Sequence, residues 1–202
     1  MGLREMKAER TRRQIAEVAV TAFIERGYDE TTMEQIAEAA EIGTSTLYRY
    51  FPSKELLILE PLAQVLDYGR YLRARPADEP LPVALGAALL AMADDFADPA
   101  RRITEIRRII DVSAVPRARL WDYFLNSRAD FEAALAERMG LAPTDHSVQI
   151  TVGIALDIFY RVDDQWKGDH TKDYRILFRD ALASLATTPI IVPKLPETTS
   201  PR

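Results

Sequence analysis

The sequence contains no cysteine and only two histidines, His146 and His170. Without thiols the chain can form no disulfide, no thiolate metal site and no cysteine nucleophile. Two imidazoles leave few candidates for zinc coordination or for a Ser-His-Asp arrangement. We therefore expect no metal and no cofactor, and an enzyme is the least favoured class of function.

A long apolar run near the start of the chain is also missing. The first ten residues, MGLREMKAER, carry charges throughout, which predicts neither a secretory signal nor a membrane span. Met6 stands where a myristoylation signal requires Ser or Thr. We expect a cytoplasmic protein that has no membrane partner.

The charge is weakly acidic overall but unevenly distributed. The 202 residues are 48% hydrophobic and 28% charged, an ordinary globular composition, and the formal net charge is -5. This balance disfavours a nonspecific nucleic-acid coat protein, which is usually basic. Two local basic patches remain: residues 1–13 hold five basic side chains against two acidic ones, and residues 42–54 hold Arg49 and Lys54 with no acid.

Apolar residues recur at helical spacing along nearly the whole chain, and no alternating run suggests a sheet. The pattern predicts an all-α protein of about nine helices. The first three span about 8–26, from Thr31 or Thr32 to Ala40, and 44–50, and Ser53 begins a long helix to about Leu72. Later helices are expected near 82–96, 101–112, 117–139, 146–166 and 172–186. The Pro-rich residues 188–202 are predicted to be a flexible tail.

The short helix 44–50 has the composition of a helix that reads DNA. Leu47 and Phe51 lie four residues apart and, with Ile42, form a narrow apolar seam. The opposite face is left with groups that can bind base edges or contact thymine methyls in a major groove. These are Thr44, Ser45, Thr46, Tyr48, Arg49 and Tyr50.

Residues 10–60 resemble the TetR family of one-component transcriptional repressors through the runs AFIERGYDETTMEQIAEAA and TLYRYFPSKELL. The resemblance implies a helix-turn-helix domain at 1–55 and an effector-binding and dimerisation domain at 56–187. It implies a homodimer that a small molecule releases from double-stranded operator DNA. It also implies that Thr32, Tyr50 and Lys54 contact phosphates and that Ser45, Thr46, Tyr48 and Arg49 face bases. Thr32 also fits a plain helix cap, and Tyr48 also fits packing on the first helix.

Three positions depart from the family pattern. Glu41 replaces the usual turn glycine, and a left-handed conformation there costs on the order of 1 kcal/mol. Gly43 replaces the usual Ser or Thr cap of the reading helix. Glu34 stands where some relatives carry a base-reading cation, so a base contact from the second helix is doubtful. The basic patch at residues 4–13 fits either a solvated segment or a DNA contact.

The two C-terminal helices carry the predicted dimer surface. Apolar residues cover more than half the circumference of helix 146–166, so this helix is expected to be buried on two sides. Helix 146–166 and the last helix of each chain are therefore predicted to form a four-helix interface across a two-fold axis. A purely internal core is the alternative. The interface residues are predicted to be Ile150, Ile154, Ile158, Arg161, Leu177, Phe178, Ala181, Leu182 and Leu185.

An effector pocket is expected between the middle helices. Its predicted lining, in which most members also fit an ordinary core, is Met92, Phe96, Ile110, Trp121, Phe124, Arg128 and Phe159. Arg128 fits either an anion-binding group or a buried salt-bridge partner. A regulator controlled by a protein partner, or with no ligand, is the alternative. The operator, the effector, the regulated genes and the sign of the ligand's effect stay open.

Overall fold

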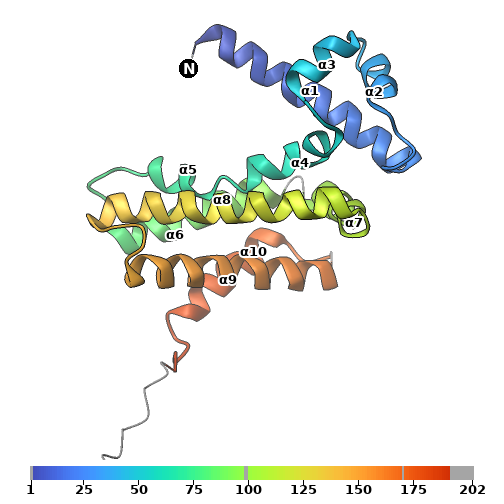
Figure 1. Cartoon of the computed structure of the whole chain (residues 1–202). Coiled ribbons are helices and arrows are strands. Elements are labelled where there is room, and N and C mark those ends of the chain that lie inside the picture. Colours follow the sequence, from blue (N-terminus) through green and yellow to red (C-terminus); the bar gives the residue numbers. More distant parts are fainter. Residues whose placement is uncertain (1, 98–99, 170, 192–202) are drawn as a thin grey trace, which may run out of the picture.

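The computed structural model describes residues 2–97, 100–169 and 171–191, and over these ranges it consists of ten α-helices with no strand. The all-α prediction is confirmed. Figure 1 shows a small unit, α1 (Leu3–Arg26), α2 (Met33–Ala39) and α3 (Thr44–Tyr50), standing at one end of a larger helical layer. The larger unit contains α4 (Lys54–Val65), α5 (Tyr68–Arg73), α6 (Leu81–Ala97), α7 (Ala100–Val112), α8 (Ala114–Met139), α9 (His146–Gly168) and α10 (Tyr174–Leu185).

The small unit is organised around the apolar face of α1. Ile15, Ala19 and Phe23 recur at four-residue spacing and are buried. They share a hydrophobic core with Ile36 of α2 and Leu47 of α3. Helix α1 begins at Leu3, five residues before the predicted start, so the first basic patch is helical.

The helix predicted from Ser53 to Leu72 is broken, which corrects that prediction. Helix α4 ends at Val65, and α5 begins at Tyr68. Ser53 precedes α4 without a side-chain cap bond, and Pro61 lies inside the helix, where its ring removes one backbone donor. The break allows α5 to approach α8 closely: a Cβ added at Gly69 would lie 2.0 Å from Asp130 Oδ2.

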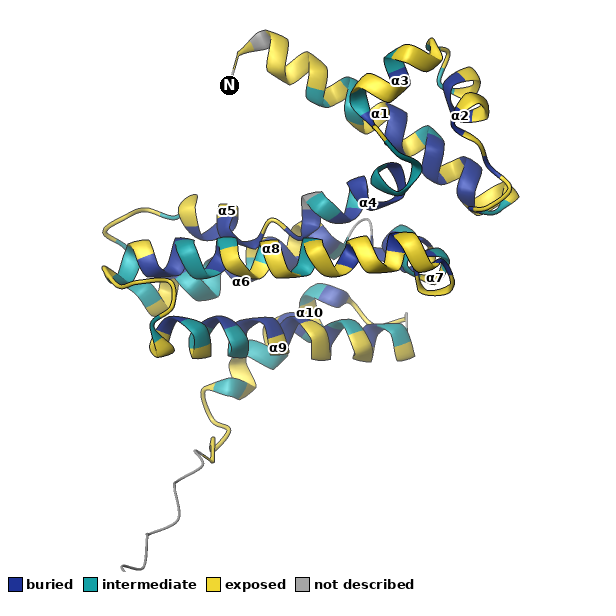
Figure 2. Cartoon of the chain, viewed as in Figure 1, coloured by how far each residue is buried: buried dark blue, intermediate teal, exposed yellow. Residues whose placement is uncertain are grey.

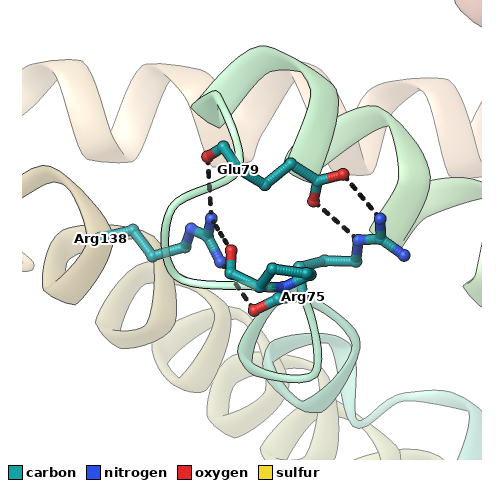
Figure 3. Close-up of polar contacts among 4 residues, drawn as sticks. Arg75, Glu79 and Arg138 are labelled. Atoms are coloured by element: carbon teal, nitrogen blue, oxygen red, sulfur yellow. Dashed lines mark hydrogen bonds and ion pairs between the residues drawn. The ribbon is translucent and has the colours of Figure 1, made fainter.

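Arginines hold the Pro-rich connection between α5 and α6 in place (Figure 3). Arg138 of α8 donates to the carbonyls of Arg75, Pro76 and Glu79 at 2.8–3.2 Å. Within the loop, the Arg75 guanidinium donates two bonds to the Glu79 carboxylate. The loop is therefore part of the helical domain rather than a linker between domains.

The same hydrophobic core continues into the larger unit, where aromatic side chains of α5, α6, α8, α9 and α10 contact one another. Figure 2 shows that α9 turns a buried face toward the rest of the domain and more exposed residues outward. None of the helices in the described residues is long and apolar enough to cross a membrane. Thr187 to Ile191 are exposed and follow α10, and the rest of the predicted tail, 192–202, lies outside the described residues.

Candidate nucleic-acid interface

A left-handed turn joins α2 to α3. Glu41 has φ 54°, and the Ile42 N–H donates to the carbonyl of Ala37, five residues earlier, at 3.0 Å, which is the Schellman bond that closes a helix C-terminus. The left-handed conformation expected at Glu41 is therefore present in a non-glycine residue. Gly43 precedes α3 without a side-chain cap, as its missing hydroxyl requires.

Helix α3 divides into a buried seam and a polar face, as the sequence predicts. Leu47 and Phe51 are completely buried, and Ile42 packs against the same core. Tyr48 keeps 44% of its surface exposed. Five other residues of α3 are predicted to contact DNA. Three of them are exposed, namely Thr44, Ser45 and Arg49, and two are half-buried, namely Thr46 and Tyr50.

Thr32 caps α2 through a reciprocal pair of bonds. The Gln35 N–H donates to Thr32 Oγ1 at 3.2 Å, and the Thr32 N–H donates to Gln35 Oε1 at 3.0 Å. The Thr32 hydroxyl proton is not used in this pair. Thr32 is exposed, so the hydroxyl can still donate to an incoming oxygen.

Lys54 is largely engaged within the protein. Its Nζ donates to the carbonyls of Tyr28 and Thr31 at 2.7 and 3.1 Å and lies 4.3 Å from the centroid of the Tyr28 ring. These bonds fix the turn before α2 to the start of α4. An ammonium has three donors, so one remains for a phosphate. Burial, with Glu55 nearby, raises the pKa of Tyr28 to about 12.

Arg12 joins three elements, a role that the sequence analysis did not foresee. From α1, its Nη1 donates to the Tyr50 carbonyl at the end of α3 at 2.7 Å. Its Nη2 lies 2.7 Å from Glu60 Oε2 of α4, and its Cζ lies 4.2 Å from the centroid of the Phe51 ring. Glu60 is almost fully buried. In the sequence, this contact is indicated locally only by the position of Glu60 on the apolar face of α4.

The residues predicted to line an effector pocket separate into two groups. Met92, Phe96, Ile110 and Phe159 are buried, and the rings of Phe96 and Phe159 meet edge to face at 5.3 Å. Phe124 is half-buried beside them.

Trp121 and Arg128 do not lie inside the domain, which corrects their placement. Trp121 is 66% exposed, and Arg128 forms an exposed ion pair with Glu132 at 2.9 Å. The helical period predicted both residues near the apolar face of α8, but the buried part of this helix does not extend to either of them. Tyr68 lies in the interior and Arg107 is half-buried, and neither was among the predicted lining residues. Arg107 could have been noticed as a cation between apolar positions of α7.

Seven of the nine predicted dimer residues line one groove, and Phe178 and Leu182 do not. Phe178 is completely buried against Phe159 and Tyr174, so it cannot contact another chain, and its assignment to the interface is wrong. Arg161 is exposed and pairs with Asp157 one turn away. The groove between α9 and α10 is lined by Ile150, Ile154, Ile158, Arg161, Leu177, Ala181 and Leu185, and Leu182 lines the adjoining groove toward α6.

Fold and site together describe an all-α protein with an N-terminal helix-turn-helix unit. Residues 15–60 match the family model of bacterial regulatory proteins, tetR family. The chain is 43% identical over 88 residues to the HTH-type transcriptional regulator TcmR of Streptomyces glaucescens, covering 43% of this chain and 39% of TcmR. It is 42% identical over 62 residues to the HTH-type transcriptional repressor KstR2 of Rhodococcus jostii, covering 30% of each. The matches thus span less than two fifths of these relatives' lengths.

Solved structures extend the likeness of fold to most of the chain. FadR of Thermus thermophilus, a TetR-family transcriptional repressor in complex with lauroyl-CoA, superposes with a TM-score of 0.59 at 20% identity, covering 95% of this chain and 99% of FadR. A TerR/AcrR-family transcriptional regulator of Aquifex aeolicus has a TM-score of 0.59 at 19% identity, covering 88% and 98%. Residues 15–60 therefore carry the helix-turn-helix segment of bacterial regulatory proteins of the tetR family, and the chain shares the fold of these two solved structures.

Proposed function

We propose that this protein is a homodimeric transcriptional repressor that binds an inverted-repeat operator and is released by a small-molecule effector. The observation that carries the proposal is the polar, exposed face of α3 above the buried seam of Leu47 and Phe51, inside the segment that matches the tetR model. Tyr48 presents its partly exposed ring on this face, where it can contact a base edge or a thymine methyl.

In this proposal α3 enters the major groove. Thr46 and Tyr48 contact base edges or thymine methyls, and Arg49 reads an adjacent base. The Thr32 hydroxyl and the free donor of Lys54 contact phosphates and set the orientation of α3. Glu34 is exposed on α2, and its charge opposes a base contact from that helix.

A second copy of the chain supplies the second half-site. One reading helix covers too few bases for useful specificity. The groove between α9 and α10 exposes Ile150 at 63% of its surface in the single chain, beside the half-buried Ile154 and Leu177. Two copies packed through this groove would form a four-helix interface. The half-sites are then expected about 34 to 36 Å apart, or a multiple of this distance.

Effector control is proposed to act through the contacts between α1 and the helical domain. Arg12 ties Glu60 of α4 to the end of α3, and Arg102 of α7 bonds Glu17 and Thr21 of α1. The coupling elements are α4, which ends before α5 begins, and α7. A ligand that shifts α4 or α7 changes the separation of the two reading helices, typically with about 1 to 3 kcal/mol of coupling. By reciprocity, operator DNA weakens ligand binding by the same factor.

The test is selection of bound sequences from random DNA by the full chain, with the Tyr48→Ala variant as control. We expect an inverted repeat for the wild type and no enriched repeat for the variant. Equal enrichment by both proteins would contradict the groove assignment. Sedimentation is run on the same samples, and a monomer at micromolar concentration would contradict the dimer.

A further inference from the structure

Four buried polar atoms of the helical domain have no hydrogen-bond partner among the described residues. One is the Nε of Arg102, whose Nη2 bonds Glu17 and Thr21 of α1, and the other three are the hydroxyls of Tyr68 and Tyr174 and the Nε of Arg107. Tyr68 is 2% exposed and Tyr174 is 3% exposed. Buried polar groups in folded proteins are nearly always paired, because an unpaired one keeps the full cost of its desolvation. Three in one region therefore need an explanation other than stability.

The three groups lie around one aromatic cluster, Tyr68, Phe96, Phe131, Phe159, Tyr174 and Phe178, drawn from α5, α6, α8, α9 and α10. The Tyr68 and Tyr174 rings lie on Phe159 at centroid distances of 5.9 and 6.4 Å. Burial raises the pKa of both tyrosines, with Asp163 adding to the effect in each, so both hydroxyls stay protonated donors at neutral pH.

Arg107 supplies the only cation at this edge of the cluster that has no carboxylate partner among the described residues. Its Cζ lies 5.5 Å from the centroid of the Phe124 ring, and no ion pair neutralises its charge. Other charges nearby are already paired: Arg128 with Glu132, and Asp163 with Lys167. Phe124 connects Arg107 to the cluster through Tyr160, whose ring lies 6.3 Å from the Phe124 ring and 6.4 Å from the Phe159 ring, centroid to centroid.

We propose that Tyr68, Arg107 and Tyr174 form the effector-recognition site and that the effector is a planar, oxygenated aromatic anion. This inference rests on the proposed function and names the ligand class for it. The anionic oxygen pairs with Arg107, and further acceptor oxygens take the two tyrosine hydroxyls. When the ligand binds, the aromatic side chains of the cluster exchange their tilted and edge-to-face contacts with one another for contacts with the ring of the ligand. Trp121 and Tyr160 lie exposed beside Phe124 and flank the entrance.

A long aliphatic acid fits these residues less well. Its carboxylate would satisfy Arg107, but its tail offers no acceptor to the second and third donors. Buried donors that a ligand leaves unpaired reduce affinity, and this discriminates against such ligands. An oxygenated ring system can satisfy all three groups.

The first experiment needs no ligand and measures the thermal midpoint Tm of single variants. Tyr68→Phe and Tyr174→Phe each remove an unpaired buried hydroxyl, so each is expected to raise Tm by about 2 to 4 °C. The control is Tyr71→Phe, one turn from Tyr68, because the Tyr71 hydroxyl bonds both Arg70 and Asp95. Its removal is expected to lower Tm. If Tyr68→Phe or Tyr174→Phe lowers Tm, that hydroxyl has a structural role and the proposal fails.

The second experiment titrates the full chain with salicylate, 1-hydroxy-2-naphthoate and 1-hydroxyanthraquinone-2-carboxylate, with laurate as the aliphatic comparison. Tryptophan fluorescence reports binding, because Trp166 lies 6.1 Å from the Tyr174 ring. We expect saturable binding of at least one aromatic acid, weakened about tenfold or more by Arg107→Met, which removes a charge-assisted bond. The same variant is expected to bind neutral 1-naphthol as the wild type does.

Saturation by none of the three aromatic acids, or tighter binding of laurate than of all three, would overturn the proposal. So would an Arg107→Met variant that binds the aromatic acid with unchanged affinity. The titration contains no DNA. Failure to find an operator therefore leaves this result standing, and failure here leaves the DNA-binding proposal standing.

Discussion

The contact between Arg12 and Glu60 gives the sharpest test of how the two parts of the molecule communicate. Glu60 is 8% exposed and Arg12 is 30% exposed at their side chains, and the Arg12 Nη2 lies 2.7 Å from Glu60 Oε2. The same guanidinium holds the Tyr50 carbonyl at the end of α3. We predict that Glu60→Gln weakens both folding stability and operator binding.

The size of the expected loss of stability depends on the contacts that Arg12 retains in the Glu60→Gln variant. Removing one partner of a fully buried ion pair costs about 3 to 5 kcal/mol. Here the arginine is partly exposed, retains the Tyr50 carbonyl and the Phe51 ring, and can still donate to the new amide oxygen. The expected loss is therefore about 1 to 2 kcal/mol in the free energy of unfolding. Operator affinity should fall about threefold to tenfold, because the end of α3 loses part of its anchor.

Urea unfolding and fluorescence anisotropy with operator DNA measure the two quantities. The matched control is Glu17→Gln, which breaks the ion pair with Arg102 between α1 and α7. That pair is 34% and 58% exposed at its side chains, so its loss is expected to cost less than about 0.5 kcal/mol. The reasoning would be refuted if Glu60→Gln matched this control in stability, or if it lost stability with no change in operator affinity.

Three further outcomes are expected. Tyr48→Ala should weaken operator binding by about 1 to 3 kcal/mol in anisotropy titrations, while Tm stays within about 1 °C, because the ring is exposed. Gly69→Ala should lower the free energy of unfolding in urea by about 1 kcal/mol or more, because the new Cβ would meet Asp130 at 2.0 Å, whereas Gly168→Ala, with open space around it, should not. Ile154→Asp should shift the protein from dimer to monomer in sedimentation, since it places a charge in the apolar groove, and an unchanged dimer would contradict the proposed interface.

Much of the N-terminal unit could be predicted from the sequence because its determinants are local. The spacing of Leu47 and Phe51 predicted the seam of α3, and the observed helix has the predicted bounds of 44–50. The capping pair of Thr32 and Gln35 and the left-handed turn at Glu41 also depend on residues only a few positions apart. Interactions within one helical turn leave a direct pattern in the sequence.

The helical domain was less predictable because its side chains choose among distant partners. Helical period alone put Trp121 near the interior, but the packing of α8 leaves this residue at the surface. The same period predicted Phe178 on the outer face of the last helix, but its ring packs against Phe159 in the aromatic cluster. A period indicates which residues share a face, while the neighbouring helices decide which faces are covered.

The sequence by itself determined an all-α chain with a helix-turn-helix unit at its start, since both follow from residues within a few positions of one another. Only the tertiary structure decided that the helix after Lys54 breaks at Leu66 and Asp67 and that Arg12 meets Glu60. It also decided that the hydroxyls of Tyr68 and Tyr174 are buried with no partner in the part of the chain that the structure describes. Each of these depends on how elements far apart in the sequence pack together. Such packing minimises exposed apolar surface over the whole domain, and no local pattern encodes it.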